Sequence, residues 1–205
     1  MADGSDTIKK GRKFDQVLDG ARDVFMAAGF DGASVDEIAR AAGVSKATLY
    51  SYFPDKRLLF AEVAKHECMR QAEMSMDEID MTGPPDAVLR EAGRRLVGFL
   101  TSEFGRQVVS LCAAESGRFP ELGRLFYESG PGLVRAHLQD YFTCCCGAET
   151  LRIDDPLLAA DQFAELCKAR IFPRMICGVQ TEFPPEELAR IVDAAVEMFM
   201  ARYAA

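Results

Sequence analysis

Residues 34–54 read SVDEIARAAGVSKATLYSYFP, and this stretch decides the fold of the chain. Ser34 stands before the first apolar positions and Glu37 follows three residues later, a spacing that predicts a helix start with a reciprocal capping box. Gly43 follows where a left-handed residue would end that helix. Ser45 is a second N-cap, and the proline that closes the stretch ends the second helix. The pattern therefore predicts a helix, a tight turn and a helix.

The second helix has an outer face that carries no acid. Its outward positions are short, hydroxylated, aromatic or basic: Ser45, Lys46, Ala47, Thr48, Tyr50 and Ser51. Free backbone amides in its first turn, together with hydroxyls and a lysine, suit phosphate oxygens and base edges in a major groove. An ordinary helical hairpin with a solvated face is the alternative. The two caps, the glycine turn and the acid-free face together favour DNA binding.

The run from Ser34 to Phe60, including VSKATLYSYFPDKRLLF, is similar to the DNA-binding domain of TetR-family transcriptional regulators. The resemblance implies an all-α fold of about nine helices, with a three-helix helix-turn-helix domain joined to a larger ligand-binding and dimerisation domain. Residue by residue, it implies DNA contacts from Ser34, Lys46, Thr48, Tyr50 and Lys56. Ser51 departs from the larger side chain, such as His, that the family often carries there, so the base preference does not transfer.

The composition predicts a folded globular protein, because 205 residues with 49% hydrophobic content can bury a substantial core. No apolar run near the N-terminus resembles a signal peptide, and no run reaches the length of a membrane span. We therefore expect a cytoplasmic protein with no membrane partner. The seven cysteines, three of them adjacent at 144–146, form neither a disulfide framework nor a paired zinc pattern. We predict no metal and no cofactor; a cysteine-based redox-sensing regulator stays open as an alternative.

The net charge of −8 is unevenly distributed along the chain. Residues 1–60 contain nine basic and nine acidic residues, whereas residues 61–205 contain fifteen basic and twenty-three acidic ones. The acidic excess therefore belongs to the second part, and a local basic surface in the first part remains compatible with DNA binding. The basic residues between Lys9 and Lys13 are either phosphate contacts or a solvated arm.

The hydrophobic periodicity predicts two domains. We expect the DNA-binding domain over residues 1–54, with 1–8 disordered, and the second domain over 55–205. In the first, an additional helix from about Lys10 to Gly29 would cover the helix-turn-helix unit. In the second, helices are expected over 55–80, 86–104, 106–116, 121–142 with a bend at 131–132, 154–176 with a kink at Pro173, and from 184 onwards.

An enzymatic function is not supported by any motif. The two histidines, His66 and His137, lie outside every pattern that brings a nucleophile to a base, so we predict no catalytic residue. The rival class is a helical small-molecule-binding protein or enzyme in which the helix-turn-helix is vestigial.

The second domain is expected to hold a ligand pocket and a dimer interface. Residues 106–131 resemble, more diffusely, the sensing domain of one subgroup of the family. Methionine and aromatic side chains on the expected pocket helices favour a small hydrophobic or aromatic effector, with candidate pocket residues His66, Met69, Phe99, Phe104, Cys112, Phe126 and Tyr127. The family's dimers pair through their last two helices, so the candidate interface residues are Phe163, Leu166, Ile191, Val192, Ala195, Val196 and Phe199.

The apolar stripes of the last two expected helices could equally pack within the core of a single chain. The expected function is that of a ligand-responsive repressor that binds a pseudo-palindromic operator in double-stranded DNA as a homodimer and is released by its effector.

Overall fold

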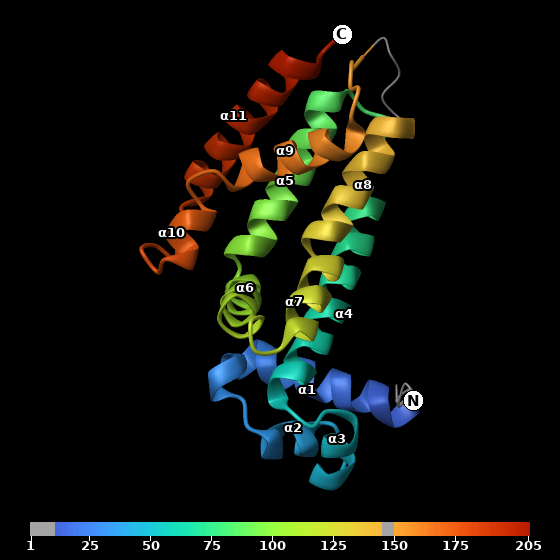
Figure 1. The fold of residues 1–205 in the computed structure, drawn as a ribbon, viewed down its shortest axis with the longest axis vertical. Coiled ribbons are helices and arrows are strands. Elements are labelled where there is room, and N and C mark those ends of the chain that lie inside the picture. Colours follow the sequence, from blue (N-terminus) through green and yellow to red (C-terminus); the bar gives the residue numbers. More distant parts are fainter. Residues whose placement is uncertain (1–10, 145–149) are drawn as a thin grey trace. The chain divides into compact units, whose positions relative to one another are not determined.

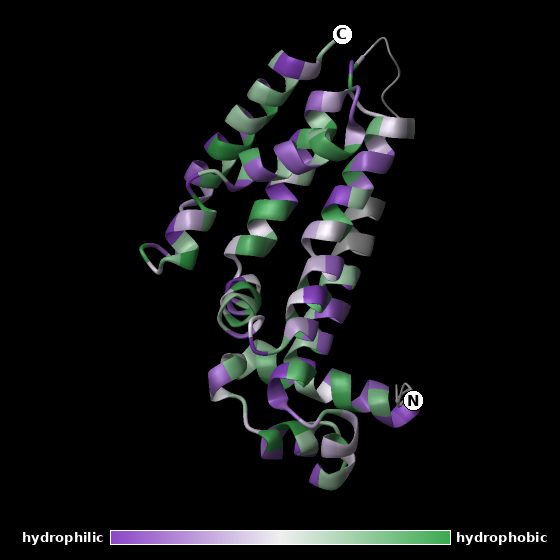
Figure 2. Cartoon of the chain, viewed as in Figure 1, coloured by the Kyte–Doolittle hydropathy of each residue, from purple (hydrophilic) through white to green (hydrophobic). Residues whose placement is uncertain are grey.

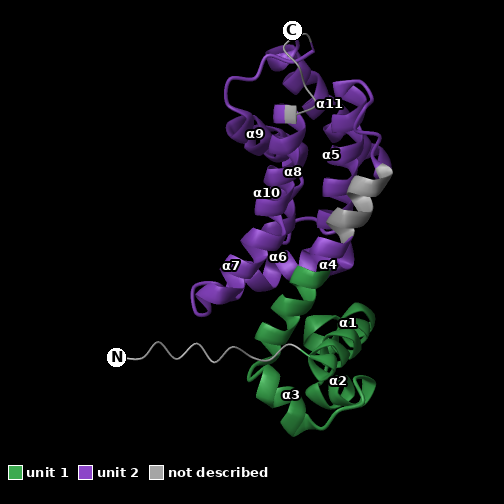
Figure 3. Cartoon of the chain, turned by 90° about the vertical axis from the view of Figure 1, so that its right-hand side faces the viewer, with its two compact units in different colours: residues 1–66 green, residues 67–205 purple. Residues whose placement is uncertain are grey.

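The computed structural model describes residues 11–144 and 150–205, apart from the side chains of 71–78 and 144. The predicted disorder at 1–8, Cys145 and Cys146 lie outside this part. Within it the chain is all-α, as predicted, with one isolated antiparallel bridge between Leu151 and Ala204 (Figure 1). It divides into two compact units, one ending at His66 and the other beginning at Glu67 (Figure 3). The first unit thus extends beyond the boundary expected at residue 54.

The described part of the first unit contains three helices and the start of a fourth: α1 (Arg12–Gly32), α2 (Val35–Ala41), α3 (Lys46–Tyr52) and the first part of α4 (Lys56–Glu78). Within α1, Gly29 leaves the helical conformation with φ 72°, at the position where the sequence predicted the helix to end. Gly20 permits α1 and α2 to approach closely, because a Cβ atom at this position would lie 2.5 Å from the backbone nitrogen of Ala42.

Aromatic rings and aliphatic side chains form the core of this unit. The rings of Phe25 and Phe60 meet edge to face with their centroids 4.9 Å apart. Ile38 of α2 and Leu49 of α3 are fully buried. This burial fixes which face of α3 remains outside.

Between Glu67 and Ala205, outside residues 145–149, the second unit contains the remainder of α4 and seven further helical segments: α5 (Pro85–Thr101), α6 (Glu103–Glu115), α7 (Pro120–Ser129), α8 (Pro131–Cys144), α9 (Pro156–Lys168), α10 (Phe172–Ile176) and α11 (Pro185–Tyr203). None of the described helices is long and apolar enough to cross a membrane. Hydrophobic and hydrophilic residues alternate along these helices, as Figure 2 shows for α11, which is the pattern of helices with one buried face.

The break between α5 and α6 differs from the prediction. It falls at Ser102, whose hydroxyl accepts a hydrogen bond from the Gly105 amide at 3.0 Å and so caps α6, whereas Gly105 was expected to separate the helices. Gly105 lies in the first turn of α6, where a Cβ atom would lie 2.0 Å from the Phe99 carbonyl oxygen. Gly105 therefore allows the Phe99 carbonyl group to approach the first turn of α6, and it does not end a helix.

Two segments expected as single bent helices are divided. Residues 121–142 form nearly all of α7 and most of α8, because Pro131 starts a new helix. The second division lies at 169–171, before the expected kink at Pro173, and Arg170 there has φ 65°. Pro173 lies in the first turn of α10, where a missing amide hydrogen costs little.

The core of the second unit lies among α5, α8, α9 and α11. Phe199 of α11 stacks on Phe142 with ring centroids 5.2 Å apart and meets Phe163 of α9 edge to face at 5.5 Å. Gly93 brings α5 close to α11, since a Cβ atom there would lie 2.8 Å from a Val192 methyl carbon. These contacts make α9 and α11 part of the protomer's own core.

Candidate functional site

The capping box at the start of α2 is present as predicted. The Ser34 hydroxyl accepts from the Glu37 amide at 3.2 Å and donates to the Glu37 carboxylate at 2.7 Å. The Ser34 amide donates to the same carboxylate at 3.1 Å. These hydrogen bonds to its charged form lower the pKa of Glu37. The start of α2 is thereby fixed by its own side chains.

The turn between α2 and α3 also follows the sequence prediction. Gly43 has φ 63°, and the Val44 amide donates to the Ala39 carbonyl oxygen at 3.0 Å. Ser45 caps α3 by accepting from the Thr48 amide at 3.1 Å, and the two hydroxyl oxygens lie 2.8 Å apart. Thr48 is therefore oriented by the cap of its own helix.

The outer face of α3 presents side chains to solvent without an acid among them. Lys46, Ala47, Tyr50 and Ser51 are exposed, Tyr50 by 49%. Lys46 forms an ion pair with Asp36 of α2, a partner that the acid-free pattern of α3 alone does not reveal. The ammonium group is therefore partly neutralised in this structure.

Lys56 is the predicted DNA-binding residue whose position differs most from the expectation. Its Nζ donates to the carbonyl oxygens of Phe30 at 2.8 Å and Ala33 at 3.0 Å, and it lies 4.4 Å from the centroid of the Phe30 ring. The ammonium group thus binds the end of α1 and the residue that follows this helix. The sequence pattern, which placed a cation at the unfavourable start of a helix, gave no sign of this intramolecular partner.

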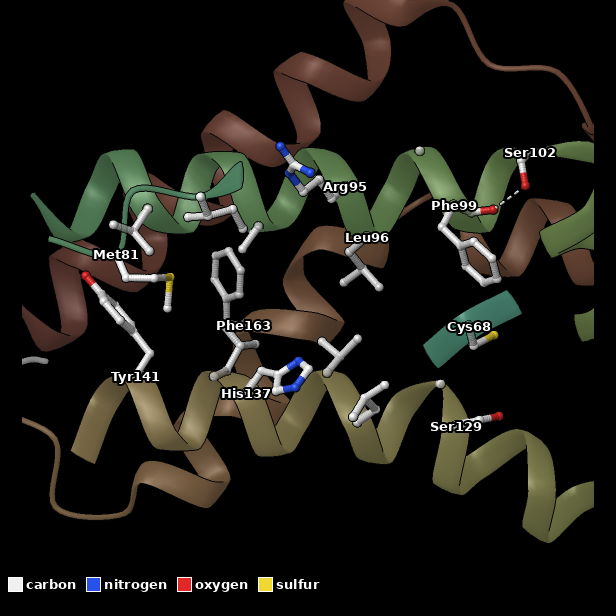
Figure 4. Close-up of a pocket in the computed structure, with 18 residues that line it drawn as sticks. Cys68, Met81, Arg95, Leu96, Phe99, Ser102, Ser129, His137, Tyr141 and Phe163 are labelled. Carbon is white, nitrogen blue, oxygen red and sulfur yellow. Dashed lines mark hydrogen bonds between the residues drawn. The ribbon is translucent and has the colours of Figure 1, made fainter. Parts of the chain in front are cut away.

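The second unit contains a cavity of about 400 Å³ (Figure 4). It is lined mainly by apolar residues of α5, α8 and α9 and of the segment after α4, with Cys68 of α4 contributing as well. Leu96 and Phe99 project from α5, and Phe163 from α9. This size and lining are typical of sites for small organic molecules.

Most polar side chains of this lining already have partners. The hydroxyls of Ser102 and Ser129 donate to the carbonyl oxygens of Phe99 at 2.7 Å and Leu125 at 2.6 Å. Arg95 donates to the Glu91 carboxylate at 2.8 Å. His137 projects from α8 into the space between α5 and α8. No Asp or Glu occurs among the lining residues that the structure describes.

Only Phe99 of the seven predicted pocket residues lines this cavity. Phe104 and Cys112 are buried elsewhere in the core, and Phe126 packs beside Leu100, Val109 and Met175. Met69 and Tyr127 are exposed by 44% and 47%. His66 belongs to the first unit and lies 3.6 Å from the Glu62 carboxylate. The hydrophobic periodicity of the sequence predicted which helix faces are apolar, but it could not predict which of these faces border a cavity.

The predicted dimer residues lie in the core of the protomer. Phe163, Ile191, Val192, Ala195, Val196 and Phe199 are all at most 8% exposed, and Leu166 packs against the same cluster. In this conformation these side chains cannot form an outer face, because α9 and α11 use their apolar stripes to pack within the unit. Other large apolar side chains are exposed on or beside α9 to α11: Leu157, Leu158, Phe172, Ile176, Val179 and Met198.

The described cysteines do not form a metal site. Burial raises the pKa of Cys68 to about 12, that of Cys167 to about 12 and that of Cys112 to about 11, which keeps these thiols protonated and weakly reactive at neutral pH. Among the described residues there is no group of three or more His, Cys, Asp or Glu side chains that could hold a metal ion.

Two family models match the chain. Residues 17–63 match the bacterial regulatory proteins of the tetR family, and residues 87–205 match the C-terminal domain of AefR-like transcriptional repressors. The chain belongs to the TetR family. Members of the TetR family are transcriptional regulators, which agrees with the prediction that the chain is not an enzyme.

Solved TetR-family structures share both units of the fold. A TetR-family regulator from Mesorhizobium loti is 29% identical, with a TM-score of 0.81, over 95% of this chain and 98% of the other. A structure named flavonoid-responsive regulator FrrA is 34% identical, with a TM-score of 0.66, over the same shares. The transcriptional repressor AcnR of Corynebacterium jeikeium is 36% identical over 74 residues, which are 36% of this chain. Those residues span only 39% of AcnR.

Proposed function

We propose that this chain is an effector-responsive transcriptional repressor that binds a pseudo-palindromic operator as a homodimer. The observation that carries the proposal is the exposed, acid-free face of α3, held in place by the cap at Ser45 and the left-handed turn at Gly43. Such a short, capped helix with small and hydroxylated outward side chains fits a major groove. The names of AcnR and of the AefR-like domain support repression over activation.

In the proposed complex, the residues of α3 and its cap face the DNA. Lys46 and the amides of the first turn bind phosphate oxygens, and Thr48, Tyr50 and Ser51 lie near base edges, with Ala47 allowing close approach. Ser34 brings the start of α2 to the neighbouring backbone. Lys56 contributes indirectly, because its ammonium group is bound to carbonyl oxygens of its own chain.

The proposed dimer forms through the exposed apolar side chains of α9 and α11. Leu157 and Leu158 of α9 are 43% and 50% exposed, and Met198 of α11 is 62% exposed. Burying such side chains between two copies of the chain would remove apolar surface from water. The recognition helices of two copies could then occupy successive major grooves.

The proposed effector is a small hydrophobic or aromatic molecule bound in the cavity of the second unit. The apolar lining supports this class, and the flavonoid-responsive regulator FrrA, 34% identical, is a relative whose name points to an aromatic effector. Binding would favour a state with lower operator affinity, by as much as the effector's affinities for the two states differ.

A fluorescence anisotropy titration with DNA from upstream of the chain's own gene tests this function. We expect tight binding that weakens steeply with salt, because phosphate contacts release counterions. Flavone and a polar control such as glucose would then be added to the complex, and only the apolar compound should release the DNA. If the helix-turn-helix were vestigial, binding to upstream DNA would be no tighter than to unrelated DNA.

A further inference from the structure

His137 is a polar side chain of the cavity without a hydrogen-bond or ion-pair partner in the described part of the chain. Its imidazole extends from α8 toward α5, and Leu96 and Phe163 line the same cavity (Figure 4). By contrast, the lining hydroxyls of Ser102 and Ser129 donate to main-chain carbonyl oxygens. His137 is half-buried and lines a cavity whose walls are largely apolar.

An imidazole held in such surroundings favours a ligand that hydrogen-bonds to it. Covering its nitrogen atoms with a purely apolar molecule would remove them from water without replacing their hydrogen bonds, which costs free energy. A ligand that places a polar group within hydrogen-bond distance of the His137 imidazole would avoid that cost. A histidine at this position would therefore distinguish a ligand that carries a hydrogen-bonding group from an apolar molecule of similar shape.

The charges of the described lining residues indicate which polar group fits. Arg95 is already paired with Glu91, and the described lining contains no carboxylate. A neutral imidazole has one donor and one acceptor, and a phenolic hydroxyl group has the complementary pair. The rings of Phe99 and Phe163 on the surrounding walls suit a planar aromatic body.

We propose that His137 determines effector specificity by hydrogen bonding to the phenolic hydroxyl group of an aromatic effector. This inference rests on the proposed function, since it assumes that the cavity of the second unit is the effector site. It adds the chemical group that the effector must carry and the residue that recognises it.

Isothermal titration calorimetry on the full chain tests the inference with a matched series: flavone, 7-hydroxyflavone and 7-methoxyflavone. The three probes share one ring system and differ in whether they carry a hydroxyl donor. We expect the native chain to bind 7-hydroxyflavone about fivefold to tenfold more tightly than flavone or 7-methoxyflavone, the range of one hydrogen bond. His137→Phe should remove this preference while still binding flavone.

Two further variants keep the result interpretable. His137→Gln retains a donor and an acceptor and should keep part of the preference, and Ser129→Ala, a lining hydroxyl with its own main-chain partner, should keep all of it. Circular dichroism establishes that each variant is folded. An unchanged preference in folded His137→Phe would overturn the proposal, as would a failure of all three flavones to bind.

Operator release, measured on the same samples, separates this inference from the proposed function. Hydroxyl-dependent binding through His137 without release from DNA would support the specificity role and contradict the repressor mechanism. Release by flavones with a preference that ignores His137 would support the mechanism and overturn the specificity role.

Discussion

The Nζ of Lys56, at the start of α4, donates a 2.8 Å hydrogen bond to the carbonyl oxygen of Phe30, near the end of α1. With its second bond to Ala33 and its position over the Phe30 ring, this side chain ties the start of α4 to the segment that leads into α2. The contact satisfies carbonyl groups at a helix end, which otherwise lack partners. Lys56 thus stabilises the DNA-binding unit from within.

Lys56→Met tests this role. The variant keeps most of the apolar stem and loses both hydrogen bonds, so we expect the free energy of unfolding to fall by about 1 to 2 kcal/mol. Chemical denaturation measures this change. The salt dependence of DNA binding should stay as in the native chain, whereas a slope smaller by about one unit would make Lys56 a phosphate contact.

Substitutions at Lys46 and at Asp36 should have opposite effects on DNA affinity. Lys46→Gln should weaken binding to all sequences and reduce the salt slope by about one unit. Asp36→Asn should strengthen binding, because it removes the acid that pairs with Lys46 in this structure. Anisotropy titrations at several salt concentrations measure both effects. Lys65→Gln, which breaks the Lys65–Glu62 ion pair elsewhere, is the matched control; equal losses in this variant would argue against a specific role for Lys46.

Two positions on α11 separate the dimer surface from the core. Met198 is 62% exposed and Val196 is 1% exposed. Met198→Glu should give a folded monomer with weakened operator binding, because a charge at an apolar interface is left unpaired. Val196→Glu should unfold the second unit. Light scattering and circular dichroism report the two outcomes, and a folded dimer of Met198→Glu would place the interface on another surface.

Two glycines predict opposite effects of the same substitution on stability. At Gly20 a Cβ atom would lie 2.5 Å from a backbone nitrogen, so Gly20→Ala should destabilise the first unit by about 1 to 3 kcal/mol. At Gly98, in α5, no described atom outside the local backbone of the helix lies within 4 Å of the added Cβ, so Gly98→Ala should stabilise the helix by about 0.5 to 1 kcal/mol. Thermal unfolding of both variants measures the contrast; similar losses would show that α5 does not tolerate a side chain there.

Local signals in the sequence were sufficient to predict the helix-turn-helix. The caps at Ser34 and Ser45 and the turn at Gly43 depend on neighbours within a few residues, and the structure contains all three. The sequence prediction placed the break between α5 and α6 at Gly105, because glycine commonly ends helices. In the structure, the missing Cβ atom of Gly105 instead makes room for the Phe99 carbonyl oxygen. That requirement exists only once the two helices have packed.

The cavity and the outer surface could not be predicted in the same way. Phe99 and Phe104 look alike in the sequence, yet the first lines a cavity and the second fills the core. Val196 and Met198 are both apolar and two residues apart on α11, and only packing against the rest of the unit decides which is buried. The role of His137 likewise depends on which helix lies opposite α8.

The position of Phe99 has a practical consequence for spectroscopy. Its side chain lies in the cavity wall, and its carbonyl oxygen accepts a hydrogen bond from the hydroxyl of Ser102, the residue that caps α6. The chain contains no Trp, so Phe99→Trp would introduce a single indole at this junction. Its emission would report both the filling of the cavity and any movement of α6 in real time, without an external dye.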